Sequence, residues 1–259
     1  MRRCRDVSNI YISCDAEEAL TDYLVSCGHT VIKVETTNLV YGAVAAHPDI
    51  YMCKLGAEPE APVYKGDKER LGFRYPQNII YNAAVCGKYF IHNLKYTDAG
   101  LLEAAGNYIE QKDGGRAENC SINEAENRRE SGSESNAEKG DAGAMIKVHT
   151  AQGYTKCNIA VVDGSHIITE DEGVFRAVSE KTDIKVLLIS PKQVKLNGFA
   201  YGFIGGTSGR IGNEMIFSGD VTKHSDYAKI RSFIEECGLD IKYFDYPLTD
   251  IGSIIEEKI

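Results

Sequence analysis

The chain has 259 residues and a formal net charge of −9, from 29 Lys and Arg against 38 Asp and Glu. This acidic balance disfavours non-specific binding to nucleic acid or to an anionic membrane surface. Hydrophobic residues make up 43% and charged residues 26% of the chain, which is typical of globular proteins. No run of residues is long and apolar enough to suggest a membrane span.

The cysteines are scattered and form no Cys-x-x-Cys pair, which argues against both a disulfide scaffold and a zinc knuckle. The N-terminus carries positive charge without an apolar segment behind it, so we expect no secretory signal. These features predict a reduced, cytoplasmic thiol protein without a metal site. The eight cysteines are Cys4, Cys14, Cys27, Cys53, Cys86, Cys120, Cys157 and Cys237.

The first predicted unit consists of a strand over residues 9–14, a helix over 15–27 and a strand over 30–35. Apolar residues recur on one face of the helix. The helix is followed by Gly28, and glycine is common just after a helix end. The N-terminal part of the chain thus predicts a strand–helix–strand unit.

Three longer units follow, and each is predicted to contain two short strands, a helix and a third strand. Gly-containing dipeptides between apolar runs, such as Asp-Gly, indicate tight hairpins. The predicted turns lie at Cys86-Gly87, Asp163-Gly164 and Gly212-Asn213, and the helices begin near Asp98, Asp171 and Ser225. A last short helix is predicted from Asp250 to the end of the chain.

This recurrence predicts a pseudo-symmetric α/β array of ββαβ-type units. The alternative is an ordinary doubly wound α/β domain, whose units lack the paired strands before each helix. Residues 112–144 are rich in Gly, Ser, Asn and Glu, which predicts a disordered, low-complexity insertion within a single domain over residues 1–259.

A glycine-rich stretch runs from Phe203 to Gly212 and resembles a dinucleotide-binding loop. Such a loop requires a helix directly after its glycines, whereas here an apparent strand follows. We therefore predict no nucleotide or other cofactor. Gly205 and Gly206 instead indicate a close approach of the backbone to a ligand or to a neighbouring unit.

The repeated units, together with His47-Pro-Asp49-Ile50, Gln152–Cys157 and Gly202–Gly206, resemble the pentein superfamily. This is the fold of guanidino-group-modifying enzymes, such as arginine and agmatine deiminases and amidinotransferases. Within it, the chain is most similar to an uncharacterised bacterial branch. The resemblance implies a pseudo-symmetric α/β propeller of ββαβ-type modules around an axial cavity.

The resemblance also implies a site. In catalytic penteins a Cys thiolate attacks the guanidinium carbon, a His transfers protons and carboxylates hold the guanidinium nitrogens. The matching candidates here are Cys157 as nucleophile, on a predicted hairpin strand, His47 as general acid/base, and Asp49 as its orienting group or as a substrate anchor. Lys156 would point to the opposite face of that strand. The candidate substrate-binding residues are Asn82, Asp171, Asp220, Gly205 and Gly206.

Each candidate also has a purely structural interpretation. Cys157 precedes an apolar run and could be a buried structural thiol, and His47 and Asp49 could cap the following strand. Asp98, Asp171 and Asp220 lie near helix starts, where Asp is a common cap.

Two functions follow. The first is a Cys-dependent hydrolase or deiminase acting on the C–N bond of a small guanidino or amide compound. The second is a non-catalytic pentein-fold protein that binds a ligand or protein partner through its axial pocket or surface. Both predict a small-molecule ligand or protein partner rather than nucleic acid or membrane, and the sequence leaves the oligomeric state open.

Overall fold

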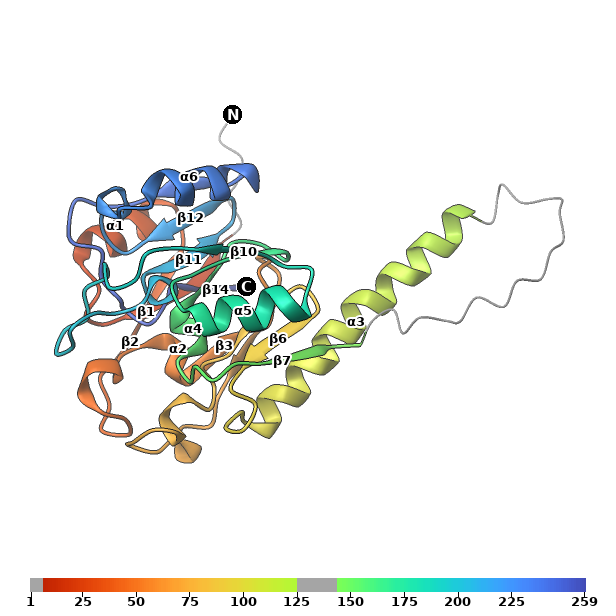
Figure 1. The fold of residues 1–259 in the computed structure, drawn as a ribbon, viewed down its shortest axis with the longest axis horizontal. Helices are drawn as coiled ribbons and strands as arrows, with labels where there is room; N and C mark the ends of the chain where they lie inside the picture. The colour runs from red at the N-terminus through yellow and green to blue at the C-terminus, as the bar shows by residue number, and fades with distance from the viewer. Residues whose placement is uncertain (1–6, 125–143) are drawn as a thin grey trace, which may run out of the picture.

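The computed structural model describes residues 7–124 and 144–259 and has a mixed α/β fold (Figure 1). Over these residues the strands form five small sheets. The mixed α/β class predicted from the sequence is therefore confirmed. Most strands are only three or four residues long, which explains why the sequence contains many short apolar runs between turns.

Four of the sheets share one plan. A central strand pairs antiparallel with one neighbour and parallel with the strand that follows its helix. Three of these sheets are β5 (Ala84–Cys86), β6 (Tyr89–His92) and β7 (Ile146–His149); β8 (Ile159–Val161), β9 (His166–Thr169) and β10 (Lys185–Leu188); and β11 (Ser208–Ile211), β12 (Glu214–Phe217) and β13 (Asp240–Lys242). These are the three predicted strand–strand–helix–strand units.

The fourth sheet joins the two ends of the described chain. Strands β1 (Ser8–Ser13) and β2 (Thr30–Val34) pair in parallel, as the first predicted unit requires. The antiparallel partner of β1 is β14 (Ile255–Lys258), which comes from the C-terminal end. The predicted helix from Asp250 is therefore wrong. The last residues complete the first unit instead, because β1 lacks a hairpin partner of its own.

The fifth sheet is a hairpin of β3 (Met52–Lys54) and β4 (Val63–Lys65), which the sequence analysis did not predict. One strand from each sheet contacts one strand of the next, and these contacts follow the order β14, β3, β5, β8, β11 and back to β14. We call these five the inner strands.

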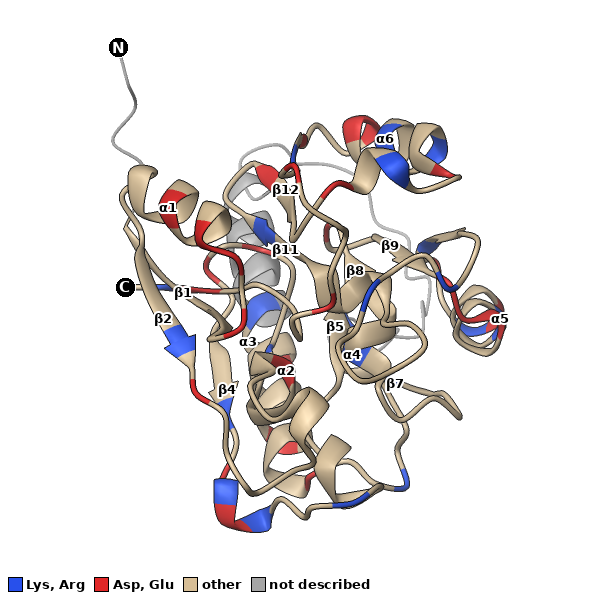
Figure 2. Ribbon diagram, turned by 90° about the vertical axis from the view of Figure 1, so that its left-hand side faces the viewer, with Lys and Arg blue, Asp and Glu red and all other residues tan. Residues whose placement is uncertain are grey.

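Each unit helix packs against the sheets through residues four apart. Buried pairs of this kind are expected where one helix face meets a core. The helices are α1 (Glu18–Ser26), α3 (Ala99–Glu124), α5 (Glu172–Lys181) and α6 (Tyr227–Glu236). Their buried residues include Leu20 and Leu24; Leu101, Ala105 and Ile109; Val174 and Val178; and Ile230 and Ile234. In Figure 2, α1, α5 and α6 lie at the periphery, whereas the one-turn helices α2 (Pro48–Tyr51) and α4 (Thr155–Asn158) lie centrally.

Helix α3 changes the boundary of the predicted insertion. The helix continues to Glu124 and extends away from the sheets (Figure 1). The first part of the predicted disordered segment over 112–144 is thus helical. The rest of that segment, residues 125–143, lies outside the described residues. Among the residues that the structure describes, no helix combines the length and hydrophobicity needed to cross a bilayer.

Candidate active site

A polar turn precedes each inner strand. Helix α2 precedes β3, Asn82 precedes β5, and α4 precedes β8. The short 3-10 helix η4 (Ile204–Thr207) precedes β11, and residues 250–253 precede β14. Hydrogen bonds connect all five turns, so residues that are far apart in sequence form one buried cluster.

The thiol of Cys157 lies within this cluster. Cys157 belongs to the one-turn helix α4 and not to a hairpin strand, which corrects the prediction. Its Sγ donates to Asp49 Oδ2 at 3.1 Å and accepts from Asn82 Nδ2 at 3.3 Å. The side chain is buried, with 2% of its surface exposed. The thiol therefore faces a carboxylate directly, with an amide fixing its position.

Asn82 holds the turns of Asp49 and Cys157 together. Its Oδ1 accepts from the backbone N–H of Lys156 at 2.8 Å and of Cys157 at 3.3 Å, and its Nδ2 also donates to the Asp49 carbonyl at 3.1 Å. Asn82 has no exposed surface. An amide that donates and accepts in this way orients both the carboxylate and the thiol.

His47 lies beside them, at the N-terminus of α2. Its backbone is extended, as expected for a residue before Pro48. His47, Asp49 and Cys157 each have one side-chain N, O or S atom that lies within 4.8 Å of those of the other two. His47 Nδ1 is 3.8 Å from Asp250 Oδ1. Among the described residues, His47 Nδ1 and Asp49 Oδ1 are buried without a hydrogen-bond partner, so both remain available to a ligand.

Lys156 enters the cluster from the helical turn. Its ammonium donates to Ser253 Oγ at 2.9 Å and to the carbonyls of Ile159 and Gly205 at 3.3 Å. Ser253 Oγ in turn donates to Asp49 Oδ2 at 2.9 Å. The strand-based expectation that Lys156 points away is wrong, because α4 is helical and its side chains do not alternate between two faces.

Two further carboxylates lie close to the cluster, and the sequence analysis did not identify either. Asp250 accepts from the backbone N–H of Phe203 at 2.9 Å and of Gly252 at 3.0 Å. Burial raises the pKa of Asp250 to about 6. Burial likewise raises the pKa of Glu170 to about 7, and the nearby charge of Asp250 acts in the same direction. Glu170 Oε1 has no hydrogen-bond partner among the residues described.

The three central groups are all shifted towards their neutral forms. Burial raises the pKa of the Cys157 thiol well above its usual range, and the charges of Asp49 and Asp250 add to this effect. Burial raises the pKa of Asp49, which His47 and Lys156 oppose. Burial lowers the pKa of His47, which Asp49 opposes. The imidazole is therefore neutral near pH 7, and so is the thiol while nothing cationic is bound.

The other predicted binding residues have structural roles. Asp171 caps α5 by accepting from Val174 N at 2.9 Å, and Asp220 accepts from Thr222 N at 3.0 Å in a separate surface turn. Asp98, which the sequence analysis also considered, accepts from Leu101 N at 2.8 Å and caps α3. None of these contacts involves Cys157. The capping interpretation accounts for all three.

Gly205 and Gly206 lie at the cluster, in η4. The Gly205 carbonyl accepts from both Lys156 and Ser253. A Cβ on Gly206 would overlap the Asp250 carboxylate. The glycines therefore permit close packing between neighbouring turns, which is the second of the two predicted roles.

Two groups of potential metal ligands among the described residues are close enough together to hold a metal ion. One is the trio of His47, Asp49 and Cys157, and the other is Asp163, His166 and Cys237. In the second group, His166 Nδ1 lies 2.9 Å from Asp163 Oδ1, so a hydrogen bond within the β8–β9 turn accounts for the arrangement. The first group coincides with the candidate nucleophile.

Comparison with known proteins identifies a family. A family model described as a family of unknown function (DUF6873) matches residues 11–114 and 137–255. The two matched segments contain every residue of the buried cluster, and the interval between them falls within the predicted insertion. No curated protein and no solved structure matches the chain. Because the match spans most of its length, the chain belongs to the DUF6873 family of unknown function.

Proposed function

We propose that this protein is a Cys-dependent hydrolase or deiminase that acts on the C–N bond of a small guanidino or amide compound. We further propose that its five sheets are modules of a pentein-type α/β propeller. The cyclic contacts of the inner strands support this architecture, as does the shared plan of four sheets. The cluster before the inner strands would then lie at one end of the propeller axis.

The observation that carries the proposal is the contact between Cys157 Sγ and Asp49 Oδ2 at 3.1 Å, with His47 beside both. A nucleophile, a proton acceptor and a second titratable group within reach form the basis of covalent catalysis at an acyl or amidino carbon. The geometry supports a narrower proposal for the roles than the sequence did. Asp49 is the group that receives the thiol proton, and neutral His47 is free to act as the base for an attacking water molecule.

The surrounding charges favour a cationic substrate. Asp49 and Asp250 are buried carboxyl groups near the thiol, Glu170 is a buried carboxyl group near Asp250, and the pKa of each is raised. A planar guanidinium or amidinium would give these groups a counterion and hydrogen-bond donors. The same cation would stabilise the Cys157 thiolate, whose formation burial and the carboxylates otherwise oppose.

The proposed reaction has two halves. The Cys157 proton passes to Asp49 as Sγ attacks the carbon of the substrate, and the C–N bond then breaks while the leaving nitrogen takes that proton from Asp49. Neutral His47 next accepts a proton from a water molecule that attacks the Sγ-bound carbon. The C–S bond breaks, Sγ takes the proton from His47 so that the thiol and the neutral imidazole are restored, and the product carries the water oxygen in place of the departed amine.

A substrate screen tests the proposal. Small guanidino and amide compounds are incubated with the wild-type protein, Cys157→Ser and the matched control Cys237→Ser, and release of ammonia or amine is measured. We expect turnover by wild type and Cys237→Ser and background rates for Cys157→Ser. Equal turnover by Cys157→Ser would refute a Cys157 nucleophile. Ligand binding without turnover in the wild type would instead support the non-catalytic binding function.

A further inference from the structure

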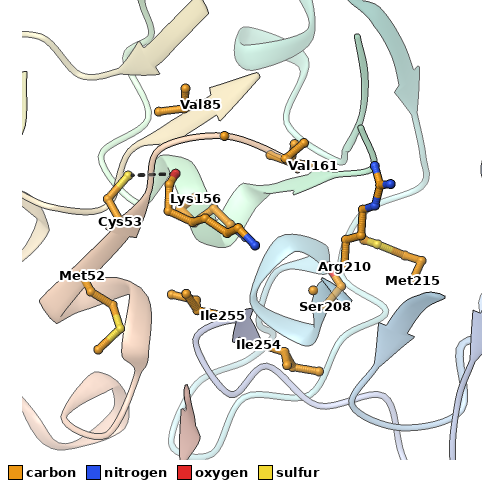
Figure 3. A pocket seen from close by; sticks show the side chains of 14 residues that line it. Met52, Cys53, Val85, Lys156, Val161, Ser208, Arg210, Met215, Ile254 and Ile255 are labelled. Atoms are coloured by element: carbon orange, nitrogen blue, oxygen red, sulfur yellow. Dashed lines mark hydrogen bonds between the residues drawn. The ribbon is translucent and has the colours of Figure 1, made fainter. Parts of the chain in front are cut away.

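A second recess lies beyond the cluster, among the inner strands themselves. Its walls include residues from β3, β5, β8, β11 and β14, so each of the five sheets contributes. Figure 3 shows the side chains of Met52, Val85, Val161 and Ile255 around the recess, with Lys156 among them. Lys156 belongs to both regions, because its ammonium also bonds Ser253 next to Asp49.

The charged residues that line this recess are all cations. They are Lys54 on β3, Arg210 on β11 and Lys156 in α4, and the described lining includes no Asp or Glu. The remaining walls are mainly apolar, which strengthens electrostatic interactions by excluding water. This contrasts with the carboxylate-rich cluster around Cys157, so the two regions suit ligands of opposite charge.

Lys54 is the least satisfied of the three cations. Its side chain is 14% exposed, and its Nζ has no hydrogen-bond acceptor among the described residues. The nearest carboxylate oxygen, Glu256 Oε2, lies 3.6 Å away, and Glu256 Oε1 already accepts from Ser8 Oγ at 3.0 Å. Burial lowers the pKa of Lys54, and the charge of Arg210 acts in the same direction. The charges of Glu256 and Glu58 oppose this shift. An anion in the recess would offset the effects of burial and of Arg210.

Arg210 and Lys156 differ in what they can offer. Arg210 Nε donates to the Gly212 carbonyl at 3.1 Å, which fixes the side chain and leaves the terminal nitrogens of the guanidinium for other acceptors. Lys156 already donates to three oxygens, so it contributes positive charge and no free hydrogen bond. Two donors and a third charge therefore line one partly apolar recess.

We propose that this recess binds a small oxyanion, a carboxylate or a phosphate, whose oxygens accept hydrogen bonds from Lys54 and Arg210. Lys156 contributes a third positive charge. Charge-assisted hydrogen bonds from Lys and Arg are the usual means of binding such groups. The proposal does not depend on catalysis by Cys157.

Isothermal titration calorimetry with inorganic phosphate and, separately, with acetate tests this site. We expect one anion per chain, and the comparison of the two probes shows whether phosphate or carboxylate is preferred. Lys54→Met and Arg210→Met should each weaken binding about tenfold or more, because each removes one charge-assisted hydrogen bond. Lys33→Met, which removes an exposed lysine from β2, should leave affinity unchanged.

Two further variants keep the result interpretable. Lys54→Arg should retain most of the affinity, which separates loss of the donor from a folding defect, and circular dichroism checks that each variant is folded. Cys157→Ala should bind the anion as the wild type does, since Cys157 is outside the recess. Unchanged affinity in both Lys54→Met and Arg210→Met would overturn the proposal, as would absence of binding by either probe at about 10 mM.

Discussion

The Cys157 thiol donates to the Asp49 carboxylate at 3.1 Å, although the two residues are 108 positions apart in the chain. Asn82 bonds to both partners, and Ser253 links the same carboxylate oxygen to the Lys156 ammonium. The contact is therefore the centre of a network to which four turns contribute. A buried structural thiol alone would not require a carboxylate next to it.

Replacing Asp49 tests its role as the proton acceptor. Asp49→Asn keeps the size of the side chain but removes the base, so we expect turnover to fall about 100-fold or more. Steady-state kinetics on a substrate from the screen measures this, with thermal unfolding as the check on folding. A rate within about threefold of wild type would assign the thiol proton to another group.

The raised pKa of Cys157 predicts opposite responses to neutral and cationic reagents. Burial and two carboxylates keep the thiol protonated, so iodoacetamide should react more slowly with folded protein than with the urea-unfolded chain at about pH 8. The rate for folded protein should still rise above about pH 9. The cationic reagent 2-chloroacetamidine should react faster with the folded form, and at lower pH.

Rates measured across the pH range by peptide mapping of Cys157 separate these effects. The two reagents are similar in size, so restricted access would slow both. If both reagents prefer the unfolded chain at every pH, the carboxylates around Cys157 do not recruit a cation.

Glu170 predicts a pH-dependent stability difference. Its pKa rises from 4.5 to about 7 on folding, so the folded chain binds this proton more tightly than the unfolded chain. The stability that this proton contributes is present below about pH 4.5 and is lost as the pH rises through about 7. Glu170→Gln removes the charge, so above about pH 8 we expect it to stabilise the fold by up to about 3 kcal/mol.

Urea unfolding of wild type and Glu170→Gln at acidic and alkaline pH measures the change. The advantage of the variant should disappear below about pH 3.5, where the wild-type carboxyl is protonated in both states. A stability difference that stays constant with pH would mean that Glu170 is not buried as described.

Gly252 predicts a backbone constraint on His47. Gly252 has a φ of +71°, and a Cβ there would overlap His47; Gly238 has nearly the same φ, +72°, and open space around it. Alanine at either position costs about 1–2 kcal/mol for the left-handed backbone. Gly252→Ala should cost about 1–3 kcal/mol more, because His47 must move.

Unfolding free energies of the two variants, with turnover measured alongside, check this comparison. Gly238→Ala should keep full activity. Gly252→Ala should lose activity, because its Cβ displaces His47. Equal destabilisation and equal activity would show that His47 tolerates displacement.

Much of the fold was predictable from local patterns. Gly87 and Gly212, both at φ +56°, mark hairpins that the sequence identified, and Asp98 and Asp171 cap the expected helices. The pairing of β14 with β1 was not predictable, because a strand partner 200 or more residues away leaves no local signal. Strand β1 was therefore predicted from its local pattern, whereas β14 was mistaken for a helix and its pairing was missed.

The candidate site followed the same pattern. His47, Asp49, Asn82 and Cys157 were identified from resemblance and polarity, and the structure brings them together. Asp250 and Ser253 were missed, since the predicted C-terminal helix hid a turn whose Gly252 and Ser253 have positive φ. The direction of the Lys156 side chain was predicted wrongly, because one helical turn was interpreted as a strand. These errors all arose where a short turn precedes an inner strand.

Covalent labelling with 2-chloroacetamidine, followed by peptide mapping of all cysteines, is the decisive experiment on the proposed role of Cys157. We predict fast labelling that is confined to Cys157, although more exposed thiols such as Cys14 and Cys237 compete for the reagent. This labelling should be lost in His47→Ala and in Asp49→Asn. Slow labelling spread over the exposed thiols, unchanged in His47→Ala, would contradict a functional guanidino-type site at Cys157.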